Sequence, residues 1–81
     1  MYIKEIDKLL SPFLVKPEAV MLMDTKDLKM GLGREQVIVF YPDRPKEVKK
    51  WADLDDETLY AVYSFVEVHA KMHPTILLDV S

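Results

Sequence analysis

The first apolar pattern in the chain is a short one with helical spacing. Ile3, Ile6 and Leu10 recur every three or four residues, and charged side chains fill the positions between them. This pattern predicts a helix over residues 2–10. Pro12 should end it, because the residue before a proline is pushed out of the α region. So short a helix does not persist alone in water, so we expect it to dock on the rest of the chain.

A longer helical pattern covers residues 55–72 and is apolar on two sides. Asp55 suits the N-cap, and the sequence His73-Pro74 should end the helix. One stripe consists of Leu59, Val62, Tyr63, Val66 and Ala70. A second stripe consists of Ala61, Phe65, Val68 and Met72. A surface helix usually has one apolar arc, so this helix is expected to be buried on more than one side.

Three further segments predict strands. Residues 19–23 form a continuous apolar run, which favours a strand, although the Met and Leu content leaves a helix over residues 17–30 open. Residues 36–41 are β-branched or aromatic after Gln36 and predict a central strand covered on both faces. Residues 75–80 predict a last strand, parallel to 36–41 if both share a sheet. Residues 42–50 predict an exposed connection.

These elements predict one α+β domain over residues 1–81. We expect a small mixed sheet of two to three strands, packed by one long C-terminal helix and a short N-terminal helix. The alternative is a mostly α fold. The chain has 81 residues and no cysteine, so neither disulfides nor a thiolate zinc site can stabilise it. A well-filled core or oligomerisation must do so.

The functional prediction rests on the second apolar stripe of the helix expected over residues 55–72. An 81-residue chain has little material to cover two stripes, and exposed apolar patches usually mark interaction surfaces. We therefore expect a small non-enzymatic protein-interaction or regulatory module that forms a homodimer or binds a protein partner. The predicted contact residues are Phe65, Val68 and Met72, with Trp51 at the edge. The alternative is that the first helix and the connector after it cover the second stripe within one chain.

A basic segment next to the single tryptophan suggests a second function. Arg44, Lys46, Lys49 and Lys50 precede Trp51, whose ring could stack on a base. Against this hypothesis stand the neighbouring carboxylates and the net charge of −3. A nucleic-acid-binding accessory protein is therefore an alternative to the interaction module.

A third hypothesis is metal binding by His69 and His73, which lie one helical turn apart. Two imidazoles at a helix C-terminus, where they interact favourably with the helix dipole, explain the pair more simply. Nothing resembles a catalytic nucleophile in a suitable context. We expect no enzymatic activity, no cofactor, no membrane-spanning segment and a cytoplasmic location.

Overall fold

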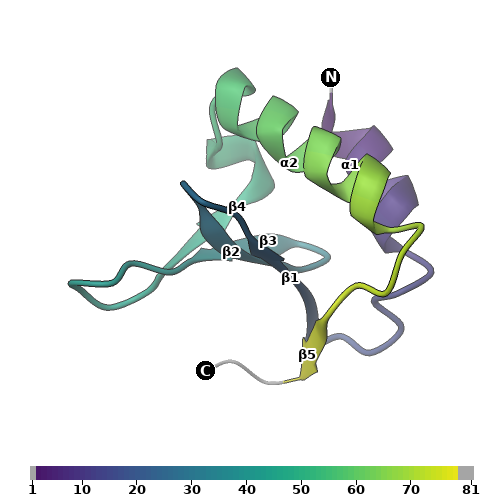
Figure 1. The fold of residues 1–81 in the computed structure, drawn as a ribbon, viewed down its shortest axis with the longest axis horizontal. Coiled ribbons are helices and arrows are strands. Elements are labelled where there is room, and N and C mark those ends of the chain that lie inside the picture. Colours follow the sequence, from purple (N-terminus) through teal and green to yellow (C-terminus); the bar gives the residue numbers. More distant parts are fainter. Residues whose placement is uncertain (1, 79–81) are drawn as a thin grey trace.

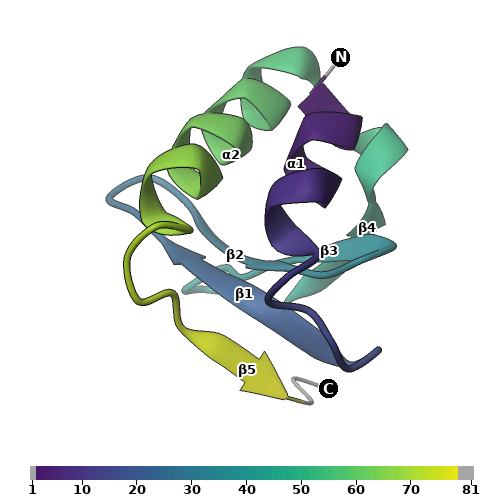
Figure 2. The ribbon, with the colours of Figure 1, turned by 90° about the vertical axis from the view of Figure 1, so that its right-hand side faces the viewer.

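The computed structural model describes residues 2–78, which form two α-helices and a sheet (Figure 1). The elements, in chain order, are α1 (Tyr2–Leu10), β1 (Ala19–Asp24), β2 (Lys29–Leu32), β3 (Gln36–Val39), β4 (Glu47–Lys50), a 3₁₀ turn (Trp51–Asp53), α2 (Asp56–His69) and β5 (Ile76–Leu78). The α+β class is confirmed. Both helices lie side by side on one face of the sheet, as Figure 2 shows.

The sheet is larger than the sequence predicted and is antiparallel throughout. Within residues 2–78 its strands lie in the order β4-β3-β2-β1-β5, and every neighbouring pair is antiparallel. The predicted mixed sheet of two to three strands is thus corrected. The pattern missed β4 because it lies at the sheet's edge and its residues are mostly charged. It missed β2 because Gly31 and Lys29 interrupt its apolar character.

The relation between β3 and β5 also differs from the expectation. Three antiparallel steps separate the two strands, so they run in opposite directions and not parallel. The helix α2 connects β4 to β5 across the whole sheet, and β5 pairs with β1. Asp79 and Val80, which the last predicted strand included, lie outside the described residues.

Strand β1 confirms the strand interpretation of the ambiguous run. Its register with β2 places Met21 opposite Leu32 and Met23 opposite Met30, and all four of these side chains are buried. The period of two turns the intervening Val20 and Leu22 to the opposite face. The run is continuously apolar because both faces of this strand carry apolar side chains.

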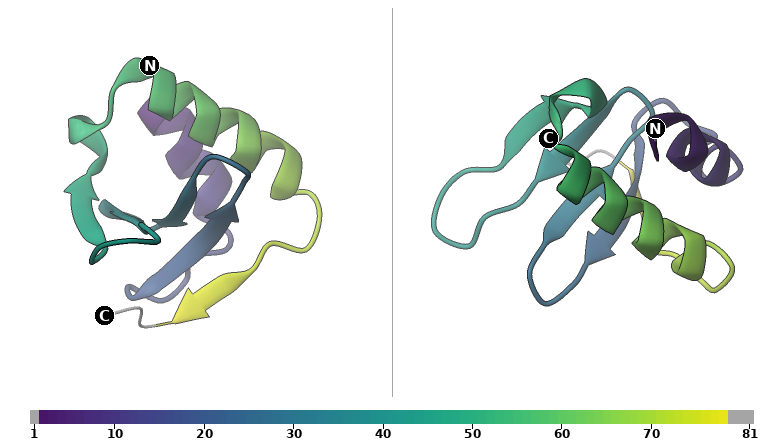
Figure 3. Two further views of the ribbon diagram at one scale, coloured as in Figure 1. Left: turned by 60° about the vertical axis from the view of Figure 1, so that its left-hand side comes forward. Right: turned by 90° about the horizontal axis from the view of Figure 1, so that it is seen from above.

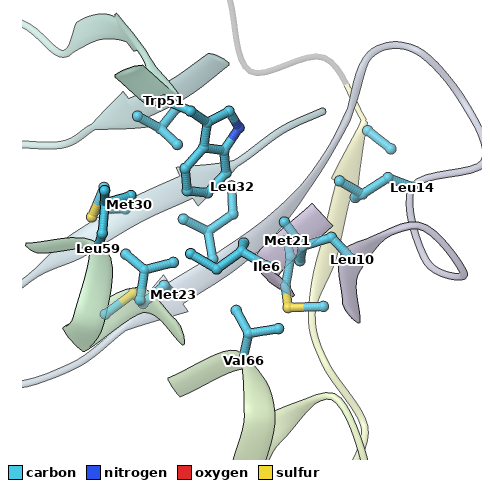
Figure 4. Close-up of a cluster of buried hydrophobic side chains, with 13 residues drawn as sticks. Ile6, Leu10, Leu14, Met21, Met23, Met30, Leu32, Trp51, Leu59 and Val66 are labelled. Carbon is cyan, nitrogen blue, oxygen red and sulfur yellow. The ribbon is translucent and has the colours of Figure 1, made fainter. Parts of the chain in front are cut away.

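The hydrophobic core fills the layer between the helices and the sheet (Figure 4). Its buried members come from both helices, the α1–β1 connector, the first three strands and the 3₁₀ turn: Ile6, Leu10, Leu14, Ala19, Met21, Met23, Met30, Leu32, Val37, Trp51, Leu59, Val62 and Val66. No side-chain nitrogen or oxygen atom in the described part of the chain is buried without a hydrogen-bond partner. The side chains of the core are therefore apolar, and no described polar side-chain atom is buried without a partner.

Helix α2 begins as the sequence predicted and ends slightly earlier. The Asp55 carboxylate accepts a hydrogen bond of 2.8 Å from the Thr58 backbone amide, which satisfies one free donor of the first turn. The helix ends at His69, with Ala70 as its C-cap, so Met72 lies in the turn that follows. The first stripe faces the core as predicted: Leu59, Val62 and Val66 are buried.

Candidate interaction surfaces

The second stripe, which we call the outer stripe, consists of Ala61, Phe65 and Val68 of α2 and of Met72 in the turn after the helix. Phe65 packs against the core, whereas the end of the stripe does not. Val68 is 57% exposed and Met72 is 64% exposed, whereas Ala61 and Phe65 are half-buried. The Phe65 ring stacks on the His69 imidazole with 4.0 Å between centroids. The described chain therefore leaves the end of this stripe open to solvent.

The position of α1 explains why the outer stripe is uncovered. Tyr2 of α1 packs against Tyr60 and Tyr63 of α2, with ring centroids 5.5 and 5.3 Å apart. Residues 60 and 63 lie on a different side of the helix from Phe65 and Val68. The connector after α1 does not close the gap, because Val15 is 80% exposed.

A second apolar surface is the sheet face opposite the helices, which we call the open sheet face. Register places Leu22, Gly31, Ile38 and Val48 side by side across four strands, and Val20 beside Leu77. No helix covers this face in residues 2–78 (Figure 3). The sequence missed this surface. Its signal was the apolar character of both faces of 19–23 and 36–41, and for 36–41 we interpreted this as a central strand covered on both faces.

Because Gly31 has no side chain, its neighbours on the open sheet face can pack against one another above it. A Cβ built on Gly31 would lie 3.4 Å from Val20 Cγ2, 3.6 Å from Ile38 Cβ and 3.6 Å from the Phe40 ring. These side chains converge over the glycine, so Val20 and Ile38 are buried without a second layer. Gly31 lies within β2 and its φ is not in the left-handed region, so the close approach of these side chains, and not a turn, is what favours glycine here.

The open sheet face is hollowed near the β2–β3 turn. A groove of about 580 Å³ is lined by the apolar residues Val20, Ile38 and Val48, and Arg34, Glu35 and Lys46 are among its other lining residues. The lining therefore combines apolar side chains with charges of both signs. This arrangement does not select one kind of small ligand.

Trp51, the predicted edge of the contact surface, lies in the core instead. Trp51 is only 8% exposed, and its Nε1–H donates a 3.1 Å hydrogen bond to the Gly33 carbonyl. The side chain closes the end of the core beneath the β2–β3 turn. Little of the ring is left to contact a partner protein or to stack on a base.

The structure separates the four cations of the nucleic-acid hypothesis. Lys49 pairs with the core residue Val37, whereas Lys50 pairs with Gln36, so the two side chains leave opposite faces of β4. Lys46 lines the groove of the open sheet face. The Arg44 guanidinium lies 4.0 Å from the centroid of the Tyr41 ring. The four cations therefore do not share one surface.

An acidic group lies within this basic segment. The Tyr41 hydroxyl donates a 2.6 Å hydrogen bond to the Glu47 carboxylate. This bond holds the pKa of Glu47 below its ordinary value, with help from Lys49 and Arg44, and it raises the pKa of Tyr41. A stable carboxylate among the cations weakens the local attraction for phosphate.

Within residues 2–78, the histidine pair does not form a metal centre with neighbouring acids. His69 Nδ1 lies 2.9 Å from the Phe65 carbonyl oxygen, a hydrogen bond within the last turn of α2. Both His69 and His73 line a small hollow of about 280 Å³ together with Leu22 and Asp24. Among residues 2–78, no group of three or more His, Cys, Asp or Glu side chains is arranged to hold a metal ion.

Two further findings do not concern a single site. Neither helix in the described residues has the length and apolar character needed to cross a membrane. Comparison with family models, with curated proteins and with solved structures found no match.

Proposed function

We propose that this protein is a non-enzymatic interaction module that self-associates through the outer stripe of α2. One observation carries the proposal: the end of the stripe is exposed although the chain has a second helix that could have covered it. That helix, α1, packs on the tyrosine side of α2 instead. Adjacent exposed apolar side chains on a small protein usually mark an interaction surface.

The chemistry of the stripe suits a contact between two copies. In a two-fold dimer the same patch is used by both subunits, so it must be able to pack against itself. Val68 and Met72 carry no charge, and the flexible Met72 side chain can adapt to its neighbour. Phe65 is already held by the stacked His69 ring, so ordering it on association costs little entropy.

The test compares two exposed valines, one on the outer stripe and one outside it. Val68→Lys adds a charge to the outer stripe, and Val15→Lys adds the same charge to the exposed α1–β1 connector. We expect a concentration-dependent dimer for the wild type and for Val15→Lys in analytical ultracentrifugation. Val68→Lys should weaken the dimer at least tenfold. A wild type that stays monomeric at all concentrations, or equal losses in both variants, would refute the proposal.

A further inference from the structure

The two edges of the sheet differ in how they are protected. Strand β4 presents Glu47, Lys49 and Lys50 at one edge. Strand β5 consists of Ile76, Leu77 and Leu78 and has no charged side chain. Edge strands of monomeric proteins are usually guarded by charge, proline or a covering element, because their free backbone groups can pair with another strand. Within the described residues, charge protects β4, whereas the protection of β5 is limited to its short length and to Pro74, two residues before the strand.

The register shows which backbone groups of β5 are free. The Leu22 amide donates a 2.8 Å hydrogen bond to the Thr75 carbonyl, so this pair is hydrogen-bonded. Hydrogen-bonded and non-hydrogen-bonded pairs alternate along an antiparallel ladder. Leu77 therefore bonds towards β1, through its pair with Val20. The amide and carbonyl groups of Ile76 and Leu78 point away from β1, to the outer edge of the sheet.

We propose that two copies of this chain pair β5 with β5 in an antiparallel manner, centred on Leu77. Ile76 of one copy then lies opposite Leu78 of the second copy, and the reverse holds across the two-fold axis. The outward backbone groups of Ile76 and Leu78 thus meet as two hydrogen-bonded pairs. This inference rests on the proposed self-association and names the strand edge at which it occurs.

The side chains are compatible with this register. Leu78 pairs with Ala19 and Ile76 with Met21, so both lie on the helix side of the sheet. Leu77 lies on the open sheet face beside Val20. Pairing would place Leu78, which is 51% exposed, against Ile76 of the second copy. Apolar cross-strand pairs of this kind stabilise a sheet.

A three-residue strand pair is too small to hold a dimer by itself. Stable interfaces bury about 800 Å² on each partner. The outer stripe can supply additional apolar area, since Phe65 of this stripe lines the same hollow as Thr75, the residue before β5. The edge would then set the register of the two copies, and the stripe would supply much of the buried surface.

Hydrogen exchange at single amides tests the pairing directly. In the monomer the Ile76 amide faces solvent, whereas the Leu77 amide is bonded to β1. We expect the exchange of Ile76, followed by NMR, to slow at least tenfold as the protein concentration rises from the monomer to the dimer. Leu77 serves as the internal control, because its β1 partner is present in both states. A dimer in which the Ile76 amide still exchanges quickly would overturn the inference.

A variant separates this inference from the proposed function. Leu78→Lys places a charge at a half-exposed position of β5, which has no charged side chain of its own. Circular dichroism checks that the variant folds. We expect it to weaken the dimer at least tenfold, with Val15→Lys again as the control. A dimer that survives Leu78→Lys but is lost in Val68→Lys refutes edge pairing alone. A wild type that never dimerises refutes both.

Discussion

Replacement of Trp51 by phenylalanine tests whether this residue belongs to the core or to a contact surface. The indole is 8% exposed, and its Nε1–H is bonded to the buried Gly33 carbonyl. Phenylalanine keeps an aromatic ring but removes the donor and part of the volume. The carbonyl then loses its partner in a place where water cannot readily replace it.

The expected loss of stability follows from the missing hydrogen-bond donor and from the smaller ring. An acceptor left unsatisfied in the interior costs about 1–3 kcal/mol. The smaller ring leaves unfilled space, which adds about 1 kcal/mol, a fraction of the cost of a full truncation to alanine. We therefore expect the free energy of unfolding to fall by about 2–4 kcal/mol. For a domain of this size, 1 kcal/mol corresponds to about 4–8 °C, so the Tm would fall by about 8–32 °C.

The assay is urea unfolding followed by circular dichroism, because Trp51 is the only tryptophan and its fluorescence is lost with it. A low protein concentration keeps self-association from adding to the measured stability. The exposed Val48→Ala is the control and should change stability by less than about 0.5 kcal/mol. If Trp51→Phe keeps wild-type stability but weakens the dimer, Trp51 acts at the interface and our interpretation of the core is wrong.

Two further predictions concern the backbone around the sheet and the helix cap. Gly33→Ala should destabilise by about 1–3 kcal/mol in urea unfolding, because the new Cβ would lie 2.7 Å from the Gln36 carbonyl oxygen. Gly31→Ala meets only ordinary contacts and should be neutral or mildly stabilising; equal losses would contradict this reasoning. Hydrogen bonds from Thr58 hold the pKa of Asp55 below its ordinary value. The ionised Asp55 therefore stabilises the folded protein above the pKa of the unfolded state, and this stabilisation is lost as the pH falls through the lower pKa of the folded state. Asp55→Asn should keep the cap but reduce the acid-induced loss of stability, and Asp55→Ala should lose the cap at neutral pH; an unchanged acid profile in Asp55→Asn would refute this.

The sequence predicted the elements whose patterns are local. The period of the apolar residues placed both helices within a few residues of their ends, because helical spacing and caps are set by near neighbours. Strands β1, β3 and β5 followed from short apolar runs. Strands β2 and β4 did not, because Gly31 interrupts one and lysines fill the other. These two segments are extended only because neighbouring strands supply their hydrogen bonds.

The candidate surfaces divide in the same way. The exposure of Val68 and Met72 agrees with a second stripe that the spacing of residues 55–72 already indicated. Trp51 was misplaced, because the sequence shows the cations beside it but not the Gly33 carbonyl that it reaches. The open sheet face was missed, since an apolar run on both faces of a strand looks the same whether or not a second layer covers it.

The sequence by itself determined the α+β class, the two helices and the excess of apolar surface, since each depends on residue type and spacing along the chain. Only the tertiary structure decided where that excess lies. Helix α1 packs beside the tyrosines of α2, both helices share one face of the sheet, and β5 forms an edge without charge. These outcomes depend on contacts between segments distant in sequence, and no local pattern encodes which of several apolar surfaces will be covered.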